Sequence, residues 1–234
     1  MPTIRNSLKS VSKRQWLLIA YLPIHLIWYL ILEAVNSGTE YTVMYCTIDD
    51  LIPFCEWFFV PYLLWFLYMI IPGFYFLKKD PEAFENYLLS MFMGFFASTL
   101  IISIFPTGQD LRPAVFTNDN IATRIMTWIY AFDTNTNVFP SMHVVGALAV
   151  AVAIGKSKTL RHNTFIQIFS PIWCLFIIMA TVFLKQHSFM DVLAAAAVEF
   201  PIIAFVYHGS AYKLLDKLSG TKRPWAEEKE TLNT

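Results

Sequence analysis

His187 and Asp191 are four residues apart in a stretch, residues 183–198, that is otherwise largely apolar. Groups at positions i and i+4 lie on one face of a helix, so a helical segment here would bring the carboxylate to the imidazole. Such a contact can hold one ring nitrogen and leave the other free to react as a nucleophile or a base. The pair is therefore the first candidate for chemistry in this chain.

Two further short sequences, FPTGQDLRP (residues 105–113) and FPSMH (residues 139–143), carry groups suited to the same chemistry. Arg112 has a planar guanidinium that matches phosphate oxygens. Ser141 is the expected N-cap of the following helix, where unpaired backbone N–H groups favour an anion, and His143 would lie in its first turn. A nucleophilic histidine beside His143 as an acid predicts a phosphoryl-transfer site, in which positive groups spread the charge of the transition state.

Each of these residues also has a purely structural interpretation. A single histidine in an apolar helix often only bonds to a neighbouring backbone, and His25 fits that description. Arg112 could be an interfacial anchor, and Glu199 a buried hydrogen-bonded glutamate. Coincidence explains His187 less well, because a carboxylate at i+4, nearby Lys185 and a second histidine accompany it.

The elements that position these groups must be apolar helices. Hydrophobic residues make up 56% of the 234-residue chain and charged residues only 15%, which is far more apolar than a soluble domain. Several runs approach the ~20 residues that a helix needs to cross ~30 Å of hydrocarbon. We therefore expect an all-α fold, an integral membrane six-transmembrane-helix bundle. The predicted spans are residues 16–34, 57–77, 86–105, 142–160, 165–184 and 190–208.

The chain contains no internal repeat, low-complexity tract or Ser/Gly linker that would divide it. We expect a single membrane domain over residues 1–234, with a cytoplasmic N-terminus (1–15), a six-helix core (16–208) and a cytoplasmic tail (209–234). The fourth span has a short apolar run, VVGALAVAVAIG, that would also suit a buried or re-entrant segment.

Basic residues are distributed unevenly between the two sides of such a bundle. One side of the bundle holds 14 of the 17 Lys and Arg residues. Four are in the N-terminus, two in the second connection, three in the fourth connection and five in the C-terminus. The positive-inside rule makes that side cytoplasmic, so the three motifs face outward. We expect a multi-pass protein of the plasma (cell) membrane, and a formal net charge of zero gives no support to nucleic-acid binding.

The first outward connection, YTVMYCTIDDLIPFCEWF, mixes acidic and aromatic residues. We interpret it as an interfacial segment, with a lid over a lipid site as the alternative. It holds Cys46 and Cys55, whereas Cys174 lies in the fifth span. One disulfide is therefore possible, and a bridge and two free thiols are equally compatible with the sequence.

The ordered set DLRP, PSMH and HSFMD resembles the three signature motifs of the type 2 phosphatidic acid phosphatase superfamily, which includes lipid phosphate phosphatases and, more distantly, vanadium haloperoxidases. The nearest resemblance is to its branch near inositol phosphorylceramide and sphingomyelin synthases, where FPT…RP, FPS-x-H and KQH-x3-D patterns occur. The resemblance in the motifs covers residues 105–191, and the similar six-helix layout extends the resemblance to nearly the whole chain.

The resemblance implies a role for each motif residue. His187 corresponds to the histidine that becomes phosphorylated, Asp191 to its orienting carboxylate and His143 to the acid that protonates the leaving group. Arg112 and Ser141 correspond to phosphate-binding residues. The family's chemistry needs no metal and no cofactor, and the outward connections of this sequence offer no metal cage.

The sequence also departs from the family pattern in each motif. Pro106 stands where a lysine is usual in the first motif, Met142 where a glycine is usual in the second, and residues 180–181 are Ala-Thr where a Ser-Arg pair usually precedes the third. Two expected phosphate-binding cations are therefore absent. Lys185, two residues before the predicted nucleophile, could replace one of them.

Three functions follow as hypotheses. The first is a membrane phosphatase that hydrolyses a lipid phosphate through a phosphohistidine intermediate. The second is a phosphotransferase that passes a phospho-head group to a lipid or head-group alcohol. The third is a transporter whose intramembrane His, Asp and Glu form a proton relay. This third hypothesis leaves Arg112 and the PSMH motif unexplained. The expected partners are a lipid phosphate or phospholipid substrate and the bilayer; the sequence gives neither the lipid nor the oligomeric state.

Overall fold

The computed structural model describes residues 13–36, 38–209, 211–212 and 214, and this part of the chain is almost entirely helical. Its α-helices are α2 (Lys13–Asn36), α3 (Ile48–Leu51), α4 (Phe59–Lys79), α5 (Pro81–Ile104), α6 (Ile121–Phe132), α7 (Met142–Lys156), α8 (Thr164–Phe183) and α9 (Phe189–Tyr207). A 3-10 turn, η1 (Glu56–Phe58), precedes α4. Two short strands, β1 (Thr42–Val43) and β2 (Thr107–Gly108), pair in parallel.

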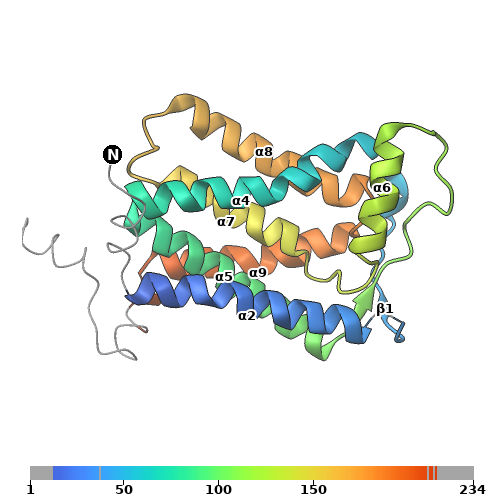
Figure 1. The fold of residues 1–234 in the computed structure, drawn as a ribbon, viewed down its shortest axis with the longest axis horizontal. Coiled ribbons are helices and arrows are strands. Elements are labelled where there is room, and N and C mark those ends of the chain that lie inside the picture. The colour runs from blue at the N-terminus through green and yellow to red at the C-terminus, as the bar shows by residue number, and fades with distance from the viewer. Residues whose placement is uncertain (1–12, 37, 210, 213, 215–234) are drawn as a thin grey trace, which may run out of the picture.

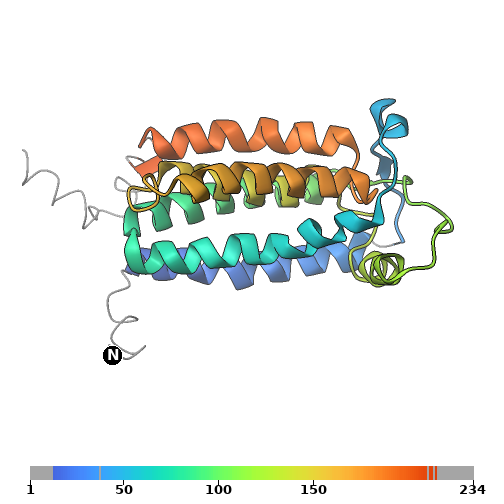
Figure 2. The ribbon, with the colours of Figure 1, turned by 90° about the horizontal axis from the view of Figure 1, so that it is seen from above.

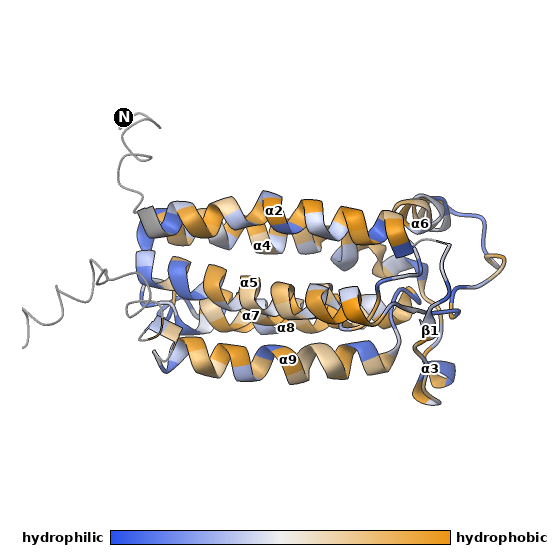
Figure 3. Ribbon diagram, turned by 90° about the horizontal axis from the view of Figure 1, so that it is seen from below, coloured by the Kyte–Doolittle hydropathy of each residue, from blue (hydrophilic) through white to orange (hydrophobic). Residues whose placement is uncertain are grey.

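Six long helices, α2, α4, α5, α7, α8 and α9, run side by side as one bundle (Figures 1 and 2). Five of them are long and apolar enough to cross a membrane, and α7 is a shorter apolar helix. Hydrophobic residues cover the length of the bundle, while hydrophilic residues gather toward its two ends (Figure 3). The predicted all-α membrane bundle is therefore confirmed, and each predicted span lies within five residues of the helix that forms it.

The fourth predicted span, residues 142–160, ends earlier than expected, at Lys156. The reason is a polar contact: the Asp80 carboxylate accepts hydrogen bonds from Ser157 Oγ at 2.7 Å and from Lys158 N at 3.0 Å. The same carboxylate caps α5 through Ala83 N. The chain therefore turns after residue 156, and α7 is about 22 Å long, short of the ~30 Å of a hydrocarbon core.

Helix α7 lies in the middle of the bundle and is built from small residues. Val145, Ala147, Ala149 and Val150 are all fully buried. Gly146 lies so close to α4 that a Cβ there would be 2.8 Å from Met69 Sδ. Small side chains let helix backbones approach one another closely, so α7 can hold the residues at its N-terminus in a fixed place relative to α4, α5 and α9.

The connections that carry the three motifs all lie at one end of the bundle, together with α3, α6 and the β1–β2 pair (Figure 1). We call this the motif end. The last turn of α4, which holds Lys78, and the α7–α8 connection, which includes Lys158, lie at the opposite end. This arrangement agrees with the predicted parity of the crossings. Most of the predicted cytoplasmic N-terminus and tail lies outside the described residues.

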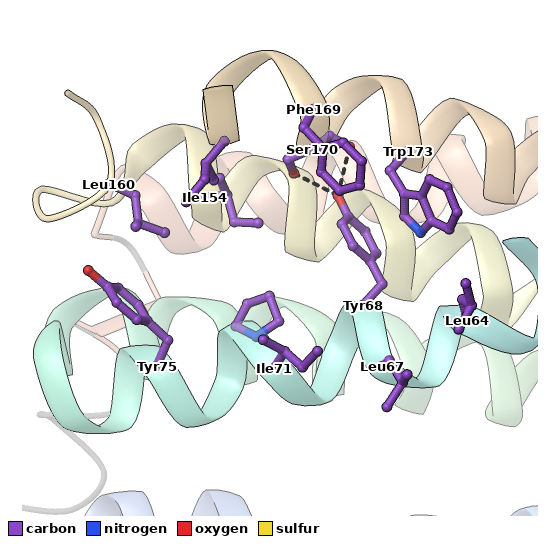
Figure 4. A pocket seen from close by; sticks show the side chains of 12 residues that line it. Leu64, Leu67, Tyr68, Ile71, Tyr75, Ile154, Leu160, Phe169, Ser170 and Trp173 are labelled. Carbon is purple, nitrogen blue, oxygen red and sulfur yellow. Dashed lines mark hydrogen bonds between the residues drawn. The ribbon is translucent and has the colours of Figure 1, made fainter. Parts of the chain in front are cut away.

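An apolar groove of about 400 Å³ opens between α4, α7 and α8, toward the end opposite the motifs. Its side chains are almost all apolar, and Tyr68 reaches across it to hydrogen-bond the carbonyl and hydroxyl of Ser170 (Figure 4). The groove shares no lining residue with the motif end.

Candidate active site

The start of α9 holds the predicted histidine and carboxylate together. Ser188 caps the helix, and its backbone N donates to Asp191 Oδ2 at 2.9 Å. His187 Nδ1 lies 3.2 Å from the same oxygen and 2.9 Å from the Val138 carbonyl. Because a carbonyl can only accept, Nδ1 carries the proton, and the Nε2 of a neutral His187 is left with a free lone pair. The helix begins after His187, so the cap itself brings the pair into contact.

The second predicted histidine comes from a different helix to the same place. His143, in the first turn of α7, has its ring centroid 5.9 Å from that of His187. Two aromatic rings of α4 fix it, because Tyr62 stacks at 4.3 Å and Trp65 lies at 4.4 Å. The structure therefore brings together two histidines that are 44 residues apart in the sequence, close enough for both to face one small group.

Ser141 lies at the N-cap of α7, as predicted, but its side chain does not cap the helix. Its backbone N donates to the Asp191 carbonyl, which ties the two motifs together. The Oγ atom is fully buried and has no hydrogen-bond partner among the described residues. A buried hydroxyl without a partner costs about 1–3 kcal/mol, so an oxygen of a bound anion would relieve that cost. The free N–H groups of the first turn favour the same anion.

Arg112 lies beside this site with most of its guanidinium already engaged. Its Nη1 donates to the Tyr130 carbonyl, and its Nη2 contacts the carbonyls of Asp133 and Thr134 and the side chain of Gln186. The group also lies 4.3 Å above the Tyr130 ring. Burial lowers the pKa of Arg112, and the nearby Asp133 opposes that shift. Its Nε is buried without an acceptor among the described residues, so this N–H is available to a ligand.

Lys185 points elsewhere. Its Nζ donates to the carbonyls of Asp49 at 2.7 Å and Ile52 at 2.6 Å, both in the first outward connection. Burial lowers its pKa, while the Asp49 charge opposes the shift. Two of the three ammonium protons are therefore committed to that connection. We leave Lys185 out of the phosphate site, where the sequence had suggested it as a substitute cation.

The comparison with protein families agrees with these motifs. The sequence model of the PAP2 superfamily matches residues 86–214, which is more than half of the chain and includes all three motifs. This chain belongs to the PAP2 superfamily. Its members act on phosphate esters as phosphatases or phosphotransferases. No curated protein and no solved structure matches the chain, so the finer placement beside inositol phosphorylceramide and sphingomyelin synthases stays a prediction.

The candidate site of this PAP2 protein also includes residues that its motifs do not reveal. Tyr62 both stacks on His143 and donates its hydroxyl hydrogen bond to the Asp133 carboxylate. Gln186 joins the two halves of the site, because its amide nitrogen lies 3.3 Å from the Tyr62 hydroxyl while its oxygen accepts from Arg112. Tyr62 carried no signal in the sequence, and we interpreted Asp133 as a loop charge; only the position of Gln186 next to His187 was a usable signal.

Carboxylates offset the positive charge of Arg112 at the motif end. Glu33 of α2 accepts from the hydroxyl of Thr134 and from Asn137 Nδ2. Glu33 and Asp133 both act electrostatically on Arg112. Among the described residues no group of three or more His, Cys, Asp or Glu side chains could hold a metal ion. Metal independence stays a prediction.

Two other sequence expectations concern residues outside the candidate site. Cys46 and Cys55 are free thiols. Glu199 is fully buried beside Gly94, and neither of its carboxylate oxygens has a hydrogen-bond partner among the described residues, so it does not fit the structural interpretation of a buried hydrogen-bonded glutamate.

Proposed function

We propose that this PAP2 protein hydrolyses the phosphate ester of a membrane lipid, with His187 as the nucleophile and His143 as the acid and base. The observation that carries the proposal is the geometry of His187. Its Nδ1 is held by the Val138 carbonyl and Asp191, and its ring lies 5.9 Å from that of His143. A lipid substrate fits a bundle whose helices are apolar along their length.

The reaction proceeds in two displacements. In the first, His187 Nε2 attacks phosphorus, the bond from phosphorus to the lipid oxygen breaks, and His143 gives its proton to that oxygen. The product is a phosphohistidine and a lipid alcohol. In the second, water attacks phosphorus, His143 takes a proton from it, and the phosphorus–nitrogen bond breaks to release phosphate.

Buried donors stabilise the transition state of both steps. Arg112 Nε and Ser141 Oγ, which have no hydrogen-bond partner among the described residues, donate to the nonbridging phosphate oxygens. The backbone N–H groups at the start of α7 add to them. Asp191 stabilises the positive charge that His187 gains when its second nitrogen forms a bond to phosphorus.

Phosphate release by the purified protein from a panel of lipid monophosphates tests the proposal. We expect turnover by the wild type, none by His187→Ala, and wild-type rates in His162→Ala, since His162 is exposed at the opposite end. Turnover in His187→Ala would overturn the assignment of the nucleophile.

A second candidate, a phosphotransferase, has support from the charges of the site. Lys185 is committed to backbone carbonyls, while Glu33 and Asp133 lie near Arg112. This balance suits a phosphodiester with one negative charge better than a doubly charged monoester. With a phospholipid donor and a lipid alcohol supplied together, a new phosphodiester lipid would favour the transferase, and free phosphate the phosphatase. Because PAP2 is a family of enzymes, we do not propose the transporter.

The predicted membrane orientation is part of this proposal. We infer that the motif end faces away from the cytoplasm, because the sequence places 14 of the 17 basic residues on the other side.

A further inference from the structure

The first outward connection does more than lie at the membrane interface. Within it, Asp49 is only 2% exposed although it carries a carboxylate. One of its oxygens, Oδ2, accepts from Cys46 N at 2.8 Å and from Ser188 Oγ at 2.6 Å. The other, Oδ1, accepts from Phe189 N at 2.7 Å. A residue 140 positions away in the sequence therefore caps the first amide of α9.

The same connection also holds the chain on the other side of the proposed nucleophile. Lys185, two residues before His187, donates to the carbonyls of Asp49 and Ile52. Its backbone has a φ of 53°, which is uncommon for a residue other than glycine and depends on surrounding contacts to persist. Cys55 N adds a hydrogen bond to the Phe183 carbonyl at the end of α8. Residues 183–189 are thus bound to this connection before and after His187.

The contacts of Asp49 lead directly to the group that orients His187. Asp49 holds the Ser188 hydroxyl, Ser188 N donates to Asp191 Oδ2, and that oxygen lies 3.2 Å from His187 Nδ1. A carboxylate is favoured at this place because the N-terminus of α9 carries a partial positive charge. Asp49 lies outside residues 86–214, the part of the chain that matches the PAP2 superfamily.

We propose that Asp49 is a positioning residue for His187. By fixing Ser188 and the first amide of α9, it sets the place of Asp191 and keeps the Nε2 atom of His187 aligned with the phosphorus atom. The inference rests on the proposed function. It concerns the alignment of the nucleophile, so it predicts an effect on the rate of phosphohistidine formation and little effect on substrate binding.

The test uses purified full-length Asp49→Asn and Asp49→Ala, with Asp50→Asn as the matched control. Asp50 is the exposed neighbour; its carboxylate accepts a hydrogen bond from the Tyr45 hydroxyl, and its charge, like that of Asp49, acts on Lys185. Asn is isosteric with Asp and keeps one acceptor oxygen, so Asp49→Asn is the variant that preserves folding best. Thermal unfolding and gel filtration measure the folded fraction, and the kinetic constants are expressed per folded protein.

We expect kcat and the rate of phosphohistidine formation to fall by about 10- to 100-fold in Asp49→Ala, the range for a misplaced reacting group, and by less in Asp49→Asn. KM should stay within about twofold, because Ser141 and Arg112 are untouched. A double-mutant cycle with Ser188→Ala should be strongly non-additive, since both residues act through the same contact. Asp50→Asn should match the wild type.

Wild-type kcat per folded protein in both Asp49 variants would overturn the inference, and so would a change confined to KM. Additive effects of Asp49→Ala and Ser188→Ala would also overturn it, because they would place Asp49 outside the path to Asp191. These outcomes differ from failure of the proposed function, which would appear as turnover in His187→Ala.

Discussion

Replacement of His143 by alanine should damage a different chemical step from replacement of His187. In the structure His143 makes aromatic contacts to Tyr62 and Trp65 and faces the His187 ring at 5.9 Å. If it protonates the leaving oxygen, its loss leaves the nucleophile and the phosphate-binding donors in place. The enzyme should then still form the intermediate whenever the leaving group departs without a proton.

The magnitude follows from the role. A positioned acid or base contributes about 10²- to 10⁴-fold, so kcat of His143→Ala on a lipid alkoxide leaving group should fall by that factor. At 1.36 kcal/mol for each factor of ten, this is about 2.7–5.4 kcal/mol of barrier. Removal of the ring also opens a gap between Tyr62 and Trp65, so thermal unfolding must be measured beside the rate.

The assay compares a lipid phosphate with an aryl phosphate whose phenolate leaves without protonation. On the aryl substrate the rate of the first step, attack by His187, should partly recover in His143→Ala. In the second step, hydrolysis of the phosphohistidine, the attacking water still lacks its base. Acid-labile phosphohistidine should therefore accumulate on His143→Ala and be absent from His187→Ala.

The matched control is His25→Ala. His25 is also buried and stacks on aromatic rings, Phe95 at 5.1 Å and Tyr21 at 5.6 Å, but it has no contact with the site residues. We expect wild-type kinetics from it. Equal impairment of His143→Ala on both substrates with no trapped intermediate, or label that persists in His187→Ala, would refute the division of roles.

Three further predictions test the site, the packing and the orientation. Arg112→Lys should lower kcat/KM by about 100-fold or more, because an ammonium cannot replace a planar guanidinium that makes four hydrogen bonds; near-wild-type activity would reduce Arg112 to an anchor. Gly94→Ala should lower the free energy of unfolding by about 1–3 kcal/mol, since its Cβ would lie 2.1 Å from Glu199 Oε2; an unchanged midpoint of thermal or denaturant unfolding would contradict this close packing. In a chain whose Cys46 and Cys55 are replaced by serine, an impermeant thiol reagent applied outside cells should label Val115→Cys, which is 79% exposed at the motif end, and spare Thr159→Cys; the reverse pattern would invert the topology.

Local sequence determined much of the framework. Apolar runs of membrane-spanning length gave the helices, because each needs only its own residues to satisfy its backbone in lipid. Asp80 caps α5 and Pro81 opens it, which is a local pattern typical of a helix start although we drew no prediction from it. The helix α6 was missed, although Asn120 and Thr123 form a capping box at its start. Its 12 residues are too few to span a membrane, so the length of apolar run that indicates a membrane span does not indicate α6.

Local sequence also determined part of the candidate site. The i, i+4 spacing was enough to pair His187 with Asp191, since a helix start places those positions side by side. The motif order was enough to group His143 and Ser141 with them by crossing parity. These inferences use only contacts within one helix or the alternation of helix ends.

Only the tertiary structure decided how charges are distributed around that site. From the sequence, Lys185 was the natural substitute for a missing phosphate-binding cation, yet its ammonium is bound by carbonyls that lie 136 and 133 residues away. Asp49 read as one acid in an interfacial loop, yet it caps α9. Whether a buried charge faces a ligand or a backbone carbonyl depends on which distant segments pack against it, and that follows from the packing of the whole bundle rather than from spacing along the chain.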